Sequence, residues 1–147
     1  MVVPGIGNTY YERALMLDAG PLIALYTLDD LRGKLVKQFL TQYAVEKYPV
    51  CVTYLIIAEV QKRLLYDVGR GQASQFLHDS LDGSINIVSI DNTDHALTKE
   101  ILERFNDQNI SFADAASMAI MKRLGIFKVM SYDFHFSLMG FEVISPS

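Results

Sequence analysis

The sequence predicts an α/β domain in which a parallel sheet of about four to five strands is covered by helices on both faces. Two observations support this fold class. Short apolar runs alternate along the chain with longer segments of helical periodicity. The runs are apolar throughout, which is typical of parallel strands buried on both faces. A length of 147 residues corresponds to a single domain.

Five apolar runs are expected to be the strands. Each is short and is followed by turn-forming or helix-capping residues, as strands of α/β proteins are. Their order in the sheet cannot be read from these patterns. The runs cover residues 14–17, 50–52, 85–90, 127–130 and 141–144.

Six helices are expected between these strands. Pro21 lies in a turn that opens the first helix, and Pro49 ends the second. Thr53 and Ser111 can cap the helices that follow them, and Gly125 fits the residue just after a helix. Two glycines, at 69 and 71, separate the third helix from the fourth. The expected helices cover residues 20–28, 31–48, 53–68, 72–81, 93–105 and 111–125.

The rest of the composition bounds the class of protein. Residues 1–12 are expected to be an N-terminal tail, and residues 13–147 the domain. No apolar run approaches the roughly 18 residues of a membrane span, and the first fifteen residues lack the features of a signal peptide. Cys51 is the only cysteine and lies in an apolar run, so a buried thiol in a reducing cytoplasm is expected.

Four acidic residues are the candidate site. Asp18 and Asp133 follow the first and fourth apolar runs, and the carboxyl ends of parallel strands meet at one edge of a sheet. Glu59 follows four apolar residues within a helix, which places it near the sheet. Asp114 lies in the first turn of the helix that begins near Ser111. The net charge of −4 equals the excess of seventeen acids over thirteen bases, so without these four acids the chain is neutral.

Each acid also has a structural interpretation. Asp18 and Asp133 could be helix caps or turn residues. Glu59 could pair with Arg63 one helical turn later. Asp114 has the spacing of a capping box with Ser111, with Asp in place of the preferred Glu.

Taken together, the four acids indicate a metal site. Carboxylates gathered at one edge repel one another unless a cation neutralises them, and an all-oxygen set suits Mg²⁺ or Mn²⁺. His78 and His95 have no partner ligand at helical spacing and are expected at the surface. His135, two residues after Asp133, is expected to approach the site as a substrate contact or a supporting group.

Four segments that carry these acids resemble the acidic motifs of PIN-domain nucleases, most closely those of the VapC-type toxins of bacterial toxin–antitoxin systems. They stand in the family's order and spacing, and the resemblance extends from about residue 15 to 144. The segments are MLDAGPLIAL, TYLIIAEV, SFADAASMAIMKRLGI and VMSYDFHFSLMGFEVI.

The resemblance implies an Mg²⁺- or Mn²⁺-dependent endoribonuclease with one or two ions. Asp18, Glu59, Asp114 and Asp133 match the four metal-binding acids, and Ser131 matches the hydroxyl residue before the last acid. The resemblance further implies hydrolysis by metal-activated water to a 5′-phosphate and a 3′-hydroxyl, a small antitoxin partner, a homodimer and a cytoplasmic location. Members commonly carry Thr or Ser directly after the first Asp, where this chain has alanine at position 19.

Five basic residues are candidate RNA contacts, although each could equally lie on a solvated helix face. They are Lys62, Arg63, Arg70, Lys122 and Arg123. Two alternative functions remain. A phospho-acceptor receiver or aspartyl phosphohydrolase is disfavoured because Gly20 stands where the latter has a second Asp. A catalytically weak or inactive PIN-like module that binds RNA or a protein is the other, and the alanine at position 19 favours it.

Overall fold

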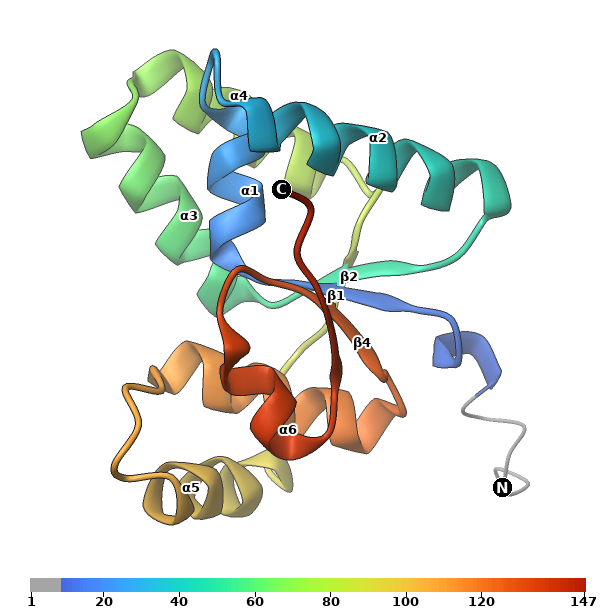
Figure 1. Cartoon of the computed structure of the whole chain (residues 1–147), viewed down its shortest axis with the longest axis vertical. Helices are drawn as coiled ribbons and strands as arrows, with labels where there is room; N and C mark the ends of the chain where they lie inside the picture. The colour runs from blue at the N-terminus through green and yellow to red at the C-terminus, as the bar shows by residue number, and fades with distance from the viewer. Residues whose placement is uncertain (1–8) are drawn as a thin grey trace.

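The structure is a computed structural model, and it describes residues 9–147. It confirms the predicted class, because a five-stranded sheet lies between two layers of helices (Figure 1). All neighbouring strands are parallel, in the order β3-β2-β1-β4-β5. The strands are β1 (Leu15–Leu17), β2 (Val50–Val52), β3 (Asn86–Ile87), β4 (Lys128–Met130) and β5 (Glu142–Ile144).

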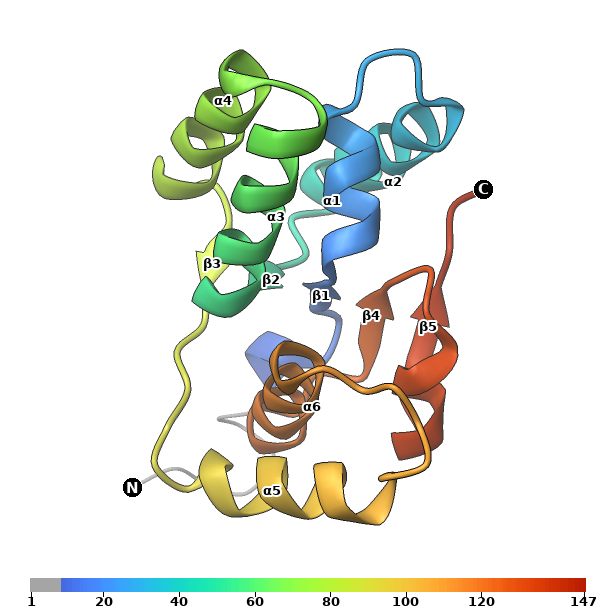
Figure 2. The same ribbon diagram turned by 90° about the vertical axis from the view of Figure 1, so that its left-hand side faces the viewer.

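Helices α1 to α4 cover one face of the sheet, and α5, α6 and the short helix η2 cover the other, as the two perpendicular views in Figures 1 and 2 show. The helices are η1 (Thr9–Tyr11), α1 (Ala19–Tyr26), α2 (Leu31–Glu46), α3 (Tyr54–Asp67), α4 (Arg70–Leu81), α5 (Asp94–Arg104), α6 (Phe112–Leu124) and η2 (Phe134–Met139).

The strands are apolar throughout because each contributes to two cores. In β1, Leu15 and Leu17 pack in the cluster under α1 to α4, whereas Met16 packs in the cluster on the α6 side. In β4, Met130 and Val129 divide in the same way. Successive side chains of a strand point to opposite faces, so a strand covered on both faces has no polar alternation.

The predicted helix signals are present. The Thr53 hydroxyl accepts a hydrogen bond of 3.2 Å from the Ile56 N–H at the start of α3. The Ser111 hydroxyl accepts one of 3.1 Å from the Asp114 N–H at the start of α6. Gly125 ends α6 with a positive φ of 78°, a conformation that glycine adopts without steric cost.

Several predicted boundaries are wrong by one or more residues, including the ends of the first two helices, which lie at Tyr26 and Glu46. The third strand was expected over residues 85–90 but covers only Asn86–Ile87. Beyond it the Val88 N–H still bonds to Val52, after which the Ser89 carbonyl accepts a side-chain hydrogen bond from Arg123 instead of strand pairing. The fourth helix starts two residues early, at Arg70, because glycine in its first turn does not prevent the helix from starting.

Residues 1–8 of the expected tail lie outside the described residues. The part that is described packs on the domain, since the Tyr10 hydroxyl accepts a 3.1 Å hydrogen bond from Asn86 of β3. In the described part of the chain, no helix has the length and apolar character needed to cross a membrane.

Candidate functional site

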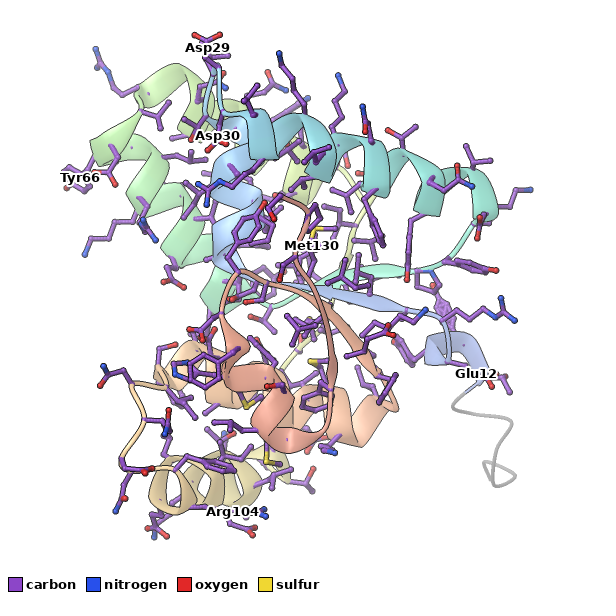
Figure 3. The ribbon with its side chains drawn as sticks, in the orientation of Figure 1. Glu12, Asp29, Asp30, Tyr66, Arg104 and Met130 are labelled. Carbon is purple, nitrogen blue, oxygen red and sulfur yellow. The ribbon has the colours of Figure 1, made fainter. Side chains whose placement is uncertain are left out.

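The four predicted acids lie at the carboxyl ends of β1 and β4, the neighbouring strands between which the chain changes its direction of progress across the sheet. From β1 the chain continues to β2 and β3 on one side, whereas β4 and β5 lie on the other. The segments that follow β1 and β4 therefore leave the sheet in different directions and open a crevice at the carboxyl ends of these strands. Met130, the last residue of β4, lies near the centre of the molecule in Figure 3, whereas Asp29, in the loop after α1, lies at its outer edge.

Asp18 is the acid at the end of β1. Only 8% of its surface is exposed, and its N–H donates to the Met130 carbonyl at 3.0 Å. Its Oδ2 accepts a hydrogen bond of 2.6 Å from the buried Ser131 hydroxyl. Although Asp18 precedes α1, its side chain makes no capping hydrogen bond. The capping interpretation therefore does not account for this carboxylate.

Asp133 is tied to the same serine. Its N–H donates to the Ser131 hydroxyl at 3.0 Å, so this one hydroxyl joins the ends of β1 and β4. The Asp133 Oδ1 accepts from the His135 N–H at 3.0 Å, which caps η2 as the alternative interpretation expects. The same oxygen lies 2.8 Å from Nδ1 of the buried His135 ring, in a contact that lacks hydrogen-bond alignment. His135 therefore contacts the Asp133 carboxylate with both its backbone N–H and its ring.

Glu59 approaches from α3 on the α1 side of the sheet. It is half-buried, and burial raises its pKa, with repulsion from Asp18 as the second cause. The charge of Arg63, one turn along α3, acts in the opposite direction. No ion pair joins Glu59 and Arg63 in the described part of the chain, so the helix-pair interpretation does not explain why this acid lies here.

Asp114 has a strongly raised pKa. Burial, repulsion from Asp18 and a hydrogen bond with that carboxylate, in this order, raise its pKa from 3.8 to about 8, with further contributions from Glu59 and Asp133. Without a cation, Asp114 is therefore protonated at neutral pH and shares its proton with Asp18. Only half of the predicted capping box forms, because the Asp114 N–H bonds to Ser111 while its carboxyl turns to Asp18.

These groups line one open cavity of about 350 Å³. A cavity of about 710 Å³ lies at the opposite end of the strands, near Tyr48 and Pro49, but Glu12 is the only acid in its lining. The chemistry therefore points to the smaller cavity. It is lined by Asp18, Ala19, Gly20, Glu59, Arg63, Asp114, Tyr132, Asp133 and Phe134.

The acids suit a divalent cation in donor type and in charge. In residues 9–147, no three Asp, Glu, His or Cys side chains already stand as a complete ligand set. Burial and the neighbouring carboxylates raise the pKa of Asp114, so a bound cation would have to displace a proton from this group. Loss of that proton and rotation of side chains would free carboxylate oxygens for Mg²⁺ or Mn²⁺.

The predicted basic residues do not form one group. Arg63 lines the cavity, Lys62 lies exposed beside it on α3, and Arg70 is exposed at the start of α4. Lys122 and Arg123 lie in the last turn of α6, about 13 Å along its axis from Asp114.

Both of these residues make contacts within the protein. Arg123 pairs with the buried Asp94 at 2.9 Å and donates to the Ser89 carbonyl, so it holds α5 against α6. The Lys122 ammonium lies 4.7 Å from the centre of the Phe141 ring. His78 and His95 are exposed, as predicted.

Two aromatic residues of the cavity were missed. Tyr132 and Phe134 flank Asp133, and both line the cavity. A Cβ atom on Gly20 would lie 3.1 Å from the Tyr132 ring, so the glycine allows this ring to pack against the start of α1. Aromatic residues beside a charged one are usually assigned to the core, so no sequence pattern pointed to a role for these two rings.

Comparison with known proteins places this geometry in context. The chain is similar to the structure of VapC20 of Mycobacterium tuberculosis, a toxin described as cleaving the sarcin–ricin loop, with 23% identity and a TM-score of 0.78 over 90% of this chain and 99% of that one. It is also similar to FitAcB of Neisseria gonorrhoeae, at 19% identity and a TM-score of 0.68 over 90% and 97% of the two chains.

A third similar structure is VapBC2 of Rickettsia felis bound to a fragment of promoter DNA, at 15% identity and a TM-score of 0.66 over 89% of this chain and 97% of that one. At these identities the likeness shows a shared fold. No curated protein matches the chain significantly in sequence. The PIN domain family matches residues 15–142, nearly the whole chain. This match shows that the protein belongs to the PIN domain family.

Proposed function

We propose that this protein is a metal-dependent endoribonuclease and the toxin of a toxin–antitoxin pair. The observation that carries the proposal is the meeting of four carboxylates from four separate segments in one cavity. Burial, followed by repulsion from the neighbouring carboxylates, raises the pKa of Asp114 to about 8. A fold gains no stability from gathering negative charge in this way, so the arrangement favours a site that a cation completes.

The residues of the cavity have distinct proposed roles. Asp18, Glu59, Asp114 and Asp133 would hold one or two Mg²⁺ or Mn²⁺ ions. When bound, such ions lower the pKa of a water molecule and neutralise charge on a phosphate. No Ser, Thr, Cys or His is among the described residues that line the cavity, so hydrolysis by water is the proposed reaction.

Two further residues orient the acids. The Ser131 hydroxyl binds Asp18 and the Asp133 backbone, and the backbone N–H of His135 donates to the side chain of Asp133. Arg63 is the proposed phosphate contact, because it is the one predicted base that lines the cavity of the described chain. Lys62 and Arg70 are proposed to follow the RNA backbone farther from the site.

The test is cleavage of single-stranded and hairpin RNAs by the purified protein in Mg²⁺, in Mn²⁺ and in EDTA. We expect cleavage that requires the metal, with 5′-phosphate products, and loss of cleavage in Asp114→Asn. The Asp107→Asn variant is the matched control, because it removes a carboxylate from an exposed loop. Cleavage that persists in EDTA or in Asp114→Asn would refute the proposed mechanism.

The partner proteins are part of the same proposal. Similar structures include a toxin–antitoxin complex from Klebsiella pneumoniae and FitAB bound to DNA, which supports a small antitoxin for this chain. We infer that the toxin forms a homodimer and acts on RNA in the cytoplasm. Purification from the native cell should yield a small bound protein, and light scattering of the free toxin should give twice the mass of 16.5 kDa.

A weak or inactive PIN-fold module that binds RNA or a protein is the second candidate. Ala19 favours it, because a methyl group lines the cavity directly beside Asp18 where a hydroxyl could bind. Binding of Mg²⁺ alone would not separate the two functions, since an inactive fold can retain its metal. RNA binding without any cleavage in Mg²⁺ or Mn²⁺ would support the module.

A further inference from the structure

The ring of Phe134 is an exposed aromatic surface at the edge of the acidic cavity. Phe134 lines the cavity, yet 60% of its surface is exposed. Phe136, two residues later in the same short helix, is fully buried. The core beneath η2 is therefore filled by Phe136, and packing alone does not explain a second phenylalanine at the mouth of the cavity.

The position of the Phe134 ring is fixed relative to the acids. Its centroid lies 4.7 Å from that of the His135 ring, and the two planes are tilted by 50°. The His135 ring is buried, and its Nδ1 lies 2.8 Å from Asp133. A continuous set of contacts thus joins the exposed ring to a carboxylate of the site. Because 60% of the surface of Phe134 is exposed, the ring can also stack on a further planar group.

The other walls of the cavity have complementary chemistry. Arg63 contributes a guanidinium from α3, and the four carboxylates form the floor. On the same side as Phe134, Tyr132 is fixed by its hydroxyl, which donates to the Pro146 carbonyl at 2.7 Å. The Arg32 guanidinium lies 4.8 Å from the centre of the Tyr132 ring. Aromatic rings and cations next to a metal-binding floor are complementary to a nucleotide, which has a planar base and a charged phosphate.

We propose that Phe134 stacks on the nucleobase next to the scissile phosphate while Arg63 binds that phosphate. This inference rests on the proposed ribonuclease function and deepens it. A base can reach the ring only when it is not paired and stacked within a helix, so the nucleotide at the cut must be unpaired. Any base can stack on an aromatic ring. Phe134 therefore determines where the RNA backbone is cut and contributes little to the choice of base at the cut.

The experiment compares wild type with Phe134→Ala, Phe134→Trp and the control Phe127→Ala. Phe127 is a similarly exposed phenylalanine, 53% against 60%, but it lies before β4, at the opposite edge of the sheet. With a short single-stranded RNA and Mg²⁺, Phe134→Ala should lower kcat/KM by about 5- to 100-fold, the usual effect of losing one stacked base. Phe134→Trp should retain the wild-type value, and so should Phe127→Ala.

A second substrate gives a readout that a change in folding would not reproduce. An RNA that lacks the base on one side of the cut should slow the wild type and leave Phe134→Ala no slower than with intact RNA. Equal losses from the missing base in both proteins would overturn the stacking assignment, as would full activity of Phe134→Ala. If the wild type cleaves no RNA in Mg²⁺ or Mn²⁺, the proposed function fails first, and the stacking assignment fails with it.

Discussion

Replacing Asp114 by asparagine should stabilise the metal-free protein at neutral and alkaline pH. The Asp114 pKa is about 8 in the folded chain against 3.8 in the reference state. The folded state thus holds a proton that the unfolded state releases. The stability from this proton is complete below pH 3.8 and is lost as the pH rises through 8.

The size of the effect follows from the shift. Each pH unit in this window lowers the free energy of unfolding by at most about 1.4 kcal/mol, or about 4 kcal/mol between pH 5 and 8. The cavity is open, so water and rotation of the Glu59 side chain relieve part of the repulsion. We expect a loss of about 1–3 kcal/mol for the wild type. Asparagine keeps a donor for Asp18 at every pH, so Asp114→Asn should lose less than half as much.

Urea denaturation in EDTA at pH 5, 6, 7 and 8 measures these slopes. The Asp107→Asn variant should keep the wild-type slope, because residue 107 is exposed in the loop between α5 and α6. Saturating Mg²⁺ at pH 8 should restore stability to the wild type, by about 2.7 kcal/mol at a hundred times its Kd. It should restore much less to Asp114→Asn. If wild type and Asp114→Asn had the same pH slope in EDTA, the shared proton would not exist and the reasoning would be refuted.

Three further changes probe other parts of the site and the fold. Ser131→Ala removes the hydroxyl that bonds to the buried Asp18, so unfolding by urea should show a loss of about 1–3 kcal/mol, and RNA cleavage should fall as well. Arg123→Ala leaves the buried Asp94 without its cation and should cost about 2–4 kcal/mol, while calorimetry should find Mg²⁺ affinity unchanged; a weaker affinity would place this arginine at the site. Ala19→Ser adds a hydroxyl to the cavity and should raise kcat about 2- to 10-fold, the effect of one hydrogen bond. An unchanged kcat would show that the missing hydroxyl at position 19 does not limit activity.

The parts of the fold that depend on local sequence were predictable. Apolar runs and capping residues located the five strands and the six α-helices of the described chain to within a few residues, whereas the short helices η1 and η2 were not predicted. Asp18 and Asp133 could be assigned to one edge because parallel strands all end at the same side of a sheet. The strand order could not be derived, since all five strands are apolar and carry no mark of their neighbours.

The features that could not be predicted from the sequence depend on interactions between residues far apart in the chain. Arg123 has the local pattern of a solvent-exposed base, yet its partner Asp94 is 29 residues away on another helix. Phe134 has the local pattern of a core residue, yet the core position is taken by Phe136. In both cases the neighbours that decide the role come together only in the folded chain.

For two of the four acids, Asp114 and Asp133, the competing interpretations are reconciled by the geometry of helix starts. Asp114 lies in the first turn of α6, where the helix dipole favours a negative charge, and its N–H is capped by Ser111. Asp133 caps η2 with one oxygen. A first turn at the edge of the sheet thus fixes the backbone of each acid while the carboxylate is turned to the cavity. The capping contacts are therefore compatible with a metal site. They hold the backbone of both acids rigidly, so that the carboxylates stay close together despite their mutual repulsion.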